Sequence, residues 1–256
     1  MCALTLRGAC SGQIKAMYRS AGGTNVMREW IDWYDSNHTI YANARHMDVH
    51  FRRIAEDIAQ YVPSPIAAVL DYGCGEALHA EIVAARAGKL ILAEPATGVR
   101  ARLAAKYAGS RKISVCDTAD LAGLPQNSID LAVMHSVAQY LPPEEMDTAL
   151  ARLRRLIKPT GALLLGDIIA ERTSAATDAL ALLRFGARDG FFIPAFIGLA
   201  RTLFSNYWSL RSSLGLTRYD EAAMIAKLAT NGFTATRQPR NIGHNQARMT
   251  FLARPA

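Results

Sequence analysis

The chain has 256 residues, half of them apolar, and a formal net charge of +7. This size and composition predict one globular domain, and no segment reaches the 18 apolar residues that would indicate a membrane-spanning helix. The basic residues are scattered without a run of five, so the charge argues only weakly for nucleic acid. The four cysteines lack metal or disulfide spacing, which predicts a cytoplasmic protein.

The first 26 residues differ in composition from the rest of the chain. They contain no Asp or Glu, three basic residues and no apolar core long enough for a secretion signal. We therefore expect residues 1–26 to be a disordered arm or an over-extended start, with Met27 as an alternative beginning. Residues 27–256 are expected to form the single domain.

A helix followed by alternating strands and helices is predicted from the apolar pattern. The helix carries a stripe with spacings of three and four and ends at Pro63; its apolar positions are Met47, Phe51, Ile54, Ile58 and Tyr61. Apolar runs that predict strands lie at 66–72, 89–94, 112–116, 129–136 and 161–169. Helix-like stretches lie at 76–87, 97–107 and 143–157. Continuous apolar strands separated by helices indicate a parallel sheet with helices on both faces.

The last part of the chain departs from this alternation. A helix near 219–231 is followed by the strands "FTATRQP" and "ARMTFLARP", and the short segment "RNIGHN" lies between them. A connection this short predicts an antiparallel hairpin. The sheet is therefore expected to have seven strands, with the seventh antiparallel.

The stretch "VLDYGCGEALHA" at 69–80 joins the first predicted strand to the next helix. In a parallel sheet such a turn lies at the ligand-binding edge, and its glycines let a ligand approach the backbone. A dinucleotide motif would need a third glycine where Leu78 stands, and Asp71 would repel a pyrophosphate. Both observations argue against a dinucleotide and favour a ligand with an ammonium group.

At this point the chain resembles the class I S-adenosylmethionine-dependent methyltransferases, in particular the small-molecule branch of the type 11 and type 12 families. The resemblance rests on five stretches: "LDYGCGEA" after strand one, the acid of "LILAEP" after strand two, "VCDTADL" after strand three, "SIDLAVMHSVAQYL" at strand four and "IKPTGALLLGDI" at strand five. It covers roughly residues 40–253 and implies a Rossmann-like fold with S-adenosylmethionine as the cofactor. The cofactor-binding residues that it implies are Asp71, Tyr72, Gly73, Cys74, Gly75, Glu94, Pro95, Asp117, Thr118 and His135. Asp120 is an alternative to Asp117.

Two histidines are candidates for accepting a proton during methyl transfer. His135 ends the fourth strand, and His244 lies in the hairpin loop after the sixth, which opens on the same edge of the sheet. A histidine packed locally in its turn is the alternative for His244. Tyr140 and Asn245 are candidate substrate contacts.

The helix near residue 50 also carries His46 and His50, spaced as in some metal sites. No carboxylate or cysteine partner follows at a metal-binding spacing, so we interpret both as residues of the helix surface and expect no metal. Tyr41 and Arg45 are expected to cover the cofactor, since the N-terminal helix of such enzymes often closes the site.

An insertion at 171–218, between strands five and six, is expected to form a helical lid. Its segment 180–218 holds many aromatic residues and five arginines against one acid, a balance of +4. This composition fits a lid packed on the sheet, a surface that meets anionic lipid on the inner face of a membrane, or a dimer interface.

The sequence therefore predicts methyl transfer to a small, apolar or lipid-like molecule. Methylation of RNA or protein is one alternative, encouraged by the pI of about 9.4. Against base methylation, "HSVAQYLPP" lacks the Asn/Asp-Pro-Pro-aromatic loop that orients a planar amine. Binding of S-adenosylmethionine without catalysis is another alternative.

Overall fold

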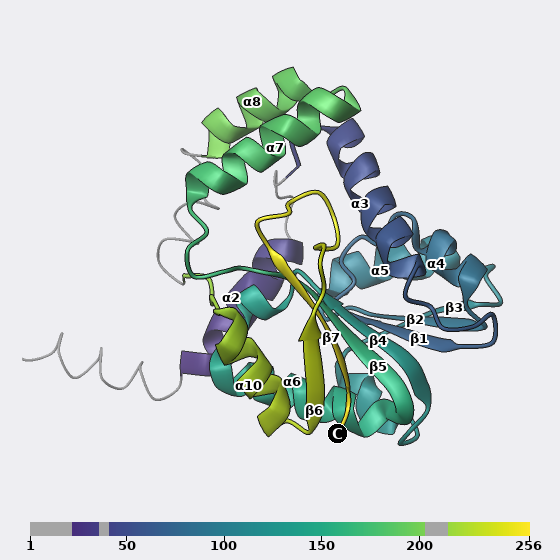
Figure 1. The fold of residues 1–256 in the computed structure, drawn as a ribbon. Helices are drawn as coiled ribbons and strands as arrows, with labels where there is room; N and C mark the ends of the chain where they lie inside the picture. The colour runs from purple at the N-terminus through teal and green to yellow at the C-terminus, as the bar shows by residue number, and fades with distance from the viewer. Residues whose placement is uncertain (1–21, 36–40, 203–214) are drawn as a thin grey trace, which may run out of the picture.

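A seven-stranded sheet forms the centre of the computed structural model, which describes residues 22–35, 41–202 and 215–256 (Figure 1). The strands are β1 (Ala68–Tyr72), β2 (Lys89–Ala93), β3 (Ile113–Cys116), β4 (Ile129–His135), β5 (Ile157–Ile168), β6 (Phe233–Arg237) and β7 (Met249–Pro255). Their order is β3-β2-β1-β4-β5-β7-β6, and β7 runs antiparallel to both of its neighbours. The predicted sheet, including its antiparallel seventh strand, is confirmed.

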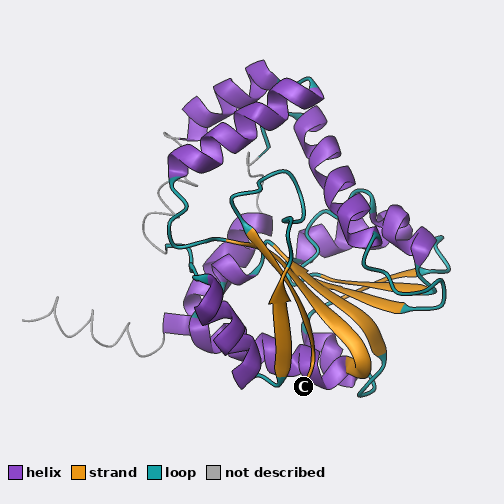
Figure 2. Cartoon of the chain, viewed as in Figure 1, coloured by secondary structure: helices purple, strands orange, loops and turns teal. Residues whose placement is uncertain are grey.

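Helices cover both faces of this sheet (Figure 2). One face packs against α3 (Ala44–Ala59), α4 (Ala80–Arg86) and α5 (Thr97–Tyr107). The other packs against α6 (Pro143–Leu156) and α10 (Glu221–Thr230). Side chains of the central strands alternate between two buried cores, so Leu131 and Val133 face α3 to α5 whereas Ala132 and Met134 face α6 and α10. This two-sided burial explains why the strands are continuous apolar runs in the sequence.

One helix and one strand begin at residues other than those predicted, and the structure shows why. The helix expected at 76–87 begins only at Ala80, because Ala77 has a φ of 37° and extends the glycine turn. Strand β5 begins at Ile157 instead of 161, because Ile157 pairs with Ile129 across a register shift. Both changes are local and leave the topology as predicted.

The N-terminal helix α2 (Gly22–Asp35) overlaps the expected arm. Residues 22–26 lie in this helix, whereas the rest of the arm lies outside the described residues. The Asp35 carboxylate accepts hydrogen bonds from the backbone amides of Gly98 and Val99, at 2.6 and 3.2 Å, and so caps the start of α5. Helix α2 is thereby held against the start of α5.

Two helices of the insertion, α7 (Ala175–Asp189) and α8 (Phe192–Thr202), follow β5 and stand beyond the sheet, next to α3 (Figure 1). They bury Phe185, Phe191 and Ala195 in a small core of their own. Residues 203–214, which belong to the expected insertion, are outside the described part of the chain. None of the described helices has the length and apolarity needed to cross a bilayer.

Candidate active site

The turn after β1 has the left-handed backbone that its glycines permit. Gly73 has a φ of 71° and Gly75 a φ of 57°. The amides of Gly73 and Cys74 both point at the carbonyl of Ala93 in β2, at 2.7 and 3.4 Å. A methyl group on Gly73 would lie 2.6 Å from a Val137 methyl carbon, so this glycine is also required by close packing.

Asp71 is the last acid before this turn, and its carboxylate has no hydrogen-bond partner among the described residues although the residue lines a cavity. Burial, and then the nearby Glu94 carboxylate, raise the pKa of Asp71 to about 7. A buried carboxylate without a partner is costly unless a cation neutralises it. The position therefore fits the amino group of a ligand.

Glu94, at the end of β2, is only 6% exposed and is held rigidly. Its Oε2 accepts the Gly75 amide and its Oε1 accepts the Ala96 amide, each at 2.9 Å. Burial raises the pKa of Glu94, although the two amides and Arg100 oppose that effect. Each oxygen retains a lone pair, so the carboxylate is oriented to accept two hydroxyl groups of a ligand.

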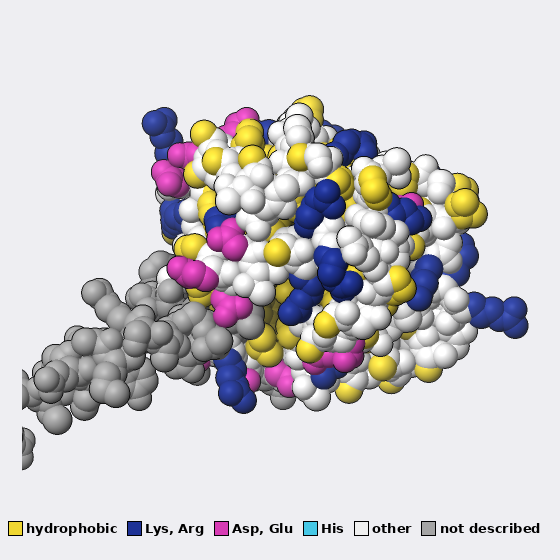
Figure 3. All heavy atoms as spheres, turned by 90° about the horizontal axis from the view of Figure 1, so that it is seen from below, with side chains coloured by type: hydrophobic (Ala, Val, Ile, Leu, Met, Phe, Trp, Pro, Cys, Tyr) yellow, Lys and Arg dark blue, Asp and Glu magenta, His cyan; other side chains and the backbone are white. Residues whose placement is uncertain are grey.

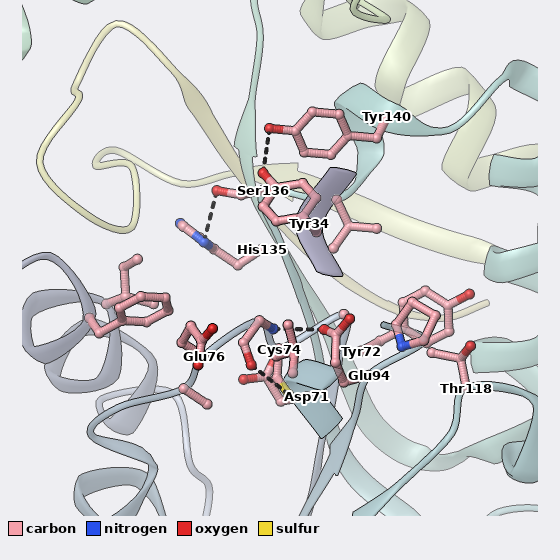
Figure 4. A pocket seen from close by; sticks show the side chains of 18 of the residues that line it. Tyr34, Asp71, Tyr72, Cys74, Glu76, Glu94, Thr118, His135, Ser136 and Tyr140 are labelled. Atoms are coloured by element: carbon pink, nitrogen blue, oxygen red, sulfur yellow. Dashed lines mark hydrogen bonds between the residues drawn. The ribbon is translucent and has the colours of Figure 1, made fainter. Parts of the chain in front are cut away.

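A cavity of about 280 Å³ joins these residues to the end of β4. Its volume is at the lower end of the roughly 300–1,000 Å³ typical of small-molecule sites. In Figure 4, Asp71, Cys74 and Glu94 lie on one side, and His135, Ser136 and Tyr140 lie on the other. The cavity lining includes these predicted site residues: Tyr41, Asp71, Tyr72, Gly73, Cys74, Gly75, Glu94, Pro95, Thr118, His135 and Tyr140. The structure thus brings most of the predicted site together.

Asp117 is outside that lining, although its neighbour Thr118 is part of it. The Asp117 carboxylate forms an ion pair with Arg100 at 3.1 Å and accepts the Ala119 amide at 2.9 Å. Its proposed contact with the cofactor stays a prediction. Asp120, the alternative, is also outside the lining and accepts the Asp117 amide at 3.1 Å.

Arg45, His244 and Asn245 also lie away from the cavity and instead hold the insertion in place. The Arg45 guanidinium donates to the Asp189 carbonyl at the end of α7, at 3.2 Å. The His244 ring stacks on Phe185 with 4.5 Å between centroids. Asn245 donates to the Asp178 carboxylate of α7 at 2.9 Å. The catalytic and binding roles of these three residues stay predictions. Their observed contacts are with the insertion.

The interpretation of His46 and His50 as helix-surface residues is wrong. His46 is 5% exposed and stacks on Phe191 with 4.7 Å between centroids. The Nδ1 of His50 is buried without a partner in the described structure. Burial, and then His244, lower the pKa of His46 to about 4. The described residues contain no cluster of His, Cys, Asp and Glu suited to a metal ion.

Three cavity residues from α2 were missed by the sequence analysis, namely Trp30, Ile31 and Tyr34. Trp30 packs against Tyr140 with 4.6 Å between ring centroids, and the hydroxyls of Tyr34 and Tyr140 are 2.8 Å apart. The apolar residues of "WIDWY", which recur one helical turn apart, were a usable signal.

Comparison with known proteins assigns residues 70–165 to a family described as "Methyltransferase domain". This part of the chain is similar to the methyltransferase domains of that family. No curated protein matched it. Among solved structures, the DhpI–SAH complex has a TM-score of 0.59 at 10% identity, covering 91% of this chain and 98% of that one. The predicted resemblance is confirmed.

Two further solved structures share the fold of this chain. Magnesium protoporphyrin IX methyltransferase (ChlM) from Synechocystis PCC 6803, solved with bound SAM, has a TM-score of 0.54 at 15% identity, over 98% of this chain and 100% of that one. Mitomycin 7-O-methyltransferase MmcR has a TM-score of 0.55 at 17% identity, over 81% of this chain and 54% of that one. At these identities the likeness establishes the class I fold alone.

Proposed function

We propose that this protein transfers a methyl group from S-adenosylmethionine to a small apolar or lipid-like molecule. The observation that carries the proposal is the single cavity that joins the glycine turn, with its unpartnered Asp71, to His135 and Tyr140. Binding groups and a candidate proton acceptor thus share one enclosed space.

The chain's own residues fit the cofactor part by part. Asp71 suits the amino group, because its carboxylate lacks any other partner in the described structure. Glu94 suits the ribose hydroxyls, because two backbone amides fix both of its oxygens. Gly75 leaves the backbone open to close approach, since the nearest atom to a methyl group there is 4.0 Å away, and Thr118 is part of the same lining.

The acceptor class is inferred from the rest of the lining. Apolar and aromatic side chains are numerous in the cavity wall; they include Trp30, Tyr34, Tyr41, Phe51, Ile54, Val137 and Tyr140. Such a wall favours an apolar ligand. The names of ChlM and MmcR describe methyltransferases with small-molecule acceptors, which supports a small-molecule acceptor here too.

The protein has little covalent chemistry to perform. Bound S-adenosylmethionine supplies a methyl group already activated on a sulfonium. The cavity orients donor and acceptor and excludes water. Burial lowers the pKa of His135, so its ring is neutral at neutral pH and is able to accept the proton that the acceptor releases.

The decisive experiment incubates cell extract with radiolabelled S-adenosylmethionine and the enzyme, and then separates lipid, small-molecule, RNA and protein fractions. We expect the label in the lipid or small-molecule fraction, and much less of it with the Asp71→Asn variant at the same cofactor concentration. Label in RNA or protein would favour the alternative methyltransferases. Cofactor binding without any labelled product would favour a non-catalytic role.

We also propose that helix α8 meets an anionic membrane surface. Its outer face exposes Phe192, Ile193, Phe196 and Ile197 to between 43% and 69%, at spacings that place them on one side of the helix. Arg184 is exposed on the adjoining α7. Figure 3 shows the molecule from the side opposite α8. On that face the basic side chains lie in several separate groups. An apolar face beside arginines suits lipids with negative headgroups.

Sedimentation with vesicles tests this contact. We expect the protein to sediment with phosphatidylglycerol-containing vesicles at low salt and much less with phosphatidylcholine alone. Replacing both Ile193 and Phe196 by Ser should weaken binding by about tenfold or more, because each exposed side chain loses apolar burial worth on the order of 1 kcal/mol. Ile66→Ser is the matched control, since Ile66 is 88% exposed at the start of β1. No sedimentation of the unaltered protein would refute the contact.

A further inference from the structure

Two strained residues lie side by side at the carboxyl ends of β4 and β5. Ser136 has a φ of 59° and Asp167 a φ of 61°, values that non-glycine residues rarely adopt. The Ser136 amide donates to the Gly166 carbonyl at 3.2 Å, which keeps the two strand ends together. Such conformations cost about 1–3 kcal/mol each and persist only where the surroundings impose them, most often at functional sites.

The strain aligns a chain of polar contacts that begins at His135. Its Nδ1 lies 3.1 Å from the Ser136 hydroxyl (Figure 4). This hydroxyl lies 2.7 Å from the Asp167 Oδ2. On the other side of the ring, Nε2 lies 3.4 Å from the Ile242 carbonyl oxygen. Three contacts therefore link four groups in a row.

One of the three contacts must lack a hydrogen-bonding proton. A neutral imidazole and a serine hydroxyl supply two protons for the three contacts. With Asp167 as a carboxylate, the short 2.7 Å contact takes the hydroxyl proton, so the Ser136 oxygen accepts from Nδ1–H. Nε2 then carries the lone pair, in agreement with its long 3.4 Å contact to Ile242.

We propose that Ser136 and Asp167 are positioning residues that make His135 Nε2 the proton acceptor of the methyl transfer. The inference rests on the proposed function. In the balanced step, the acceptor atom gains the methyl carbon, the carbon–sulfur bond breaks with its electron pair left on sulfur, and the acceptor's proton moves to Nε2. The protonated chain then has three protons for its three contacts, and Asp167 faces the positive ring through Ser136.

The packing around the ring supports this orientation. A methyl group on Gly166 would lie 2.9 Å from the His135 Cδ2, so the ring lies directly on the neighbouring strand. The Asp167 backbone amide donates to the buried Asn241 side chain at 3.1 Å, which holds the backbone of Asp167 in place. The ring therefore has little freedom to exchange its partners.

The charged and titratable groups near His135 come from three elements. Burial lowers its pKa, whereas Asp167 of β5, the Ile242 carbonyl and Asp57 of α3 oppose that effect. His50 of α3 and His244 of the β6–β7 loop also interact with it electrostatically. Asp167 is the only one of these groups that reaches the ring through a hydrogen bond of another side chain.

Nitrogen-15 NMR of the histidine rings in the full-length protein tests the proposal, with His135→Gln to assign the signals. We expect neutral His135 to be the Nδ1–H tautomer. In Ser136→Gly, which removes the hydroxyl without adding backbone strain, it should change to the Nε2–H tautomer that donates to Ile242. In Asp167→Asn the negative charge near the ring is lost, so the measured pKa of His135 should fall by about 1. Asparagine tolerates the left-handed backbone at this position. Glu144→Gln, an exposed site, is the control.

Cofactor binding and turnover separate this inference from the proposed function. Calorimetry with S-adenosylmethionine should give an unchanged Kd for Asp167→Asn, while its labelling rate in the extract assay falls about tenfold or more. An Nε2–H tautomer in the unaltered protein, or an unchanged tautomer in Ser136→Gly, would overturn the relay and leave the methyltransferase intact. Failure of the unaltered protein to bind the cofactor would instead overturn the proposed function.

Discussion

Asp71→Asn is expected to weaken S-adenosylmethionine binding by about 30- to 150-fold. A charge-assisted hydrogen bond at a buried site is worth about 2–3 kcal/mol, and each 1.4 kcal/mol is a factor of ten. No other described residue supplies a partner to this carboxylate, so the variant leaves the ligand's amino group without its counter-charge. Isothermal calorimetry measures the loss, and Glu144→Gln, with the same charge change on an exposed helix start, should bind normally.

The same substitution should also remove a pH dependence. The free protein holds Asp71 with a pKa of about 7, and an ammonium group favours its ionised form. Affinity should therefore rise between pH 6 and 7.5 in the unaltered protein and stay flat in Asp71→Asn. Equal slopes in the two proteins would contradict the assignment of Asp71 to the amino group.

The folding stability of the ligand-free protein should fall as the pH rises, whereas its affinity for the cofactor should rise. Because the folded-state pKa of Asp71 is raised, its contribution to stability is present at low pH and is lost as the pH rises toward about 7. Without ligand, Asp71→Asn should therefore melt at a higher temperature than the unaltered protein at pH 8, with the difference vanishing near pH 4. A variant that binds weakly and melts later is not a misfolded one.

The second large effect is expected at Gly73. Both Gly73→Ala and Gly75→Ala force a side chain into a left-handed backbone, at a cost of about 1–2 kcal/mol. Only at Gly73 does the new methyl group meet another atom closely, 2.6 Å from Val137, whereas at Gly75 the nearest atom is 4.0 Å away. Gly73→Ala should thus lose about 2–5 kcal/mol of unfolding free energy, because overpacking adds about 1–3 kcal/mol.

Urea unfolding of the two variants separates packing from backbone strain. Gly109→Ala is the control, because a methyl group there has no atom within 4 Å and the backbone is not left-handed. Its stability should be unchanged or slightly raised. Equal losses at Gly73 and Gly75 would show that the contact with Val137 is relieved without cost. Cofactor affinity should fall with Gly73→Ala, since the turn supports Asp71 and Glu94.

Local patterns were enough to predict the sheet. Strands buried on both faces must be apolar throughout, and their runs are visible in the sequence. The short connection expected between the last two strands left no room for a crossover, so the antiparallel β7 also followed from the chain alone; in the structure residues 238–248 join the two strands. The cofactor residues were predictable for a related reason, because Gly73, Gly75 and Glu94 follow directly after strands whose ends meet at one edge.

Contacts between distant segments were not predictable in the same way. His46 lies on α3, and its stripe of apolar neighbours indicated only the face that meets the sheet. The opposite side is covered by Phe191, from an insertion some 145 residues away in the chain, so a residue that looked exposed is buried. The pairing of Asp117 with Arg100 likewise depends on how α5 lies beside β3.

The sequence by itself determined the class of the fold, the position of the cofactor turn and the two acids beside it, because period, loop length and glycine spacing act over a few residues. Only the tertiary structure decided which groups meet across the cavity. Ser136 and Asp167 are 31 residues apart, and their hydrogen bond exists because β4 and β5 are neighbours with both ends held in a strained conformation. No local pattern encodes that meeting, since it arises from the register of two whole strands.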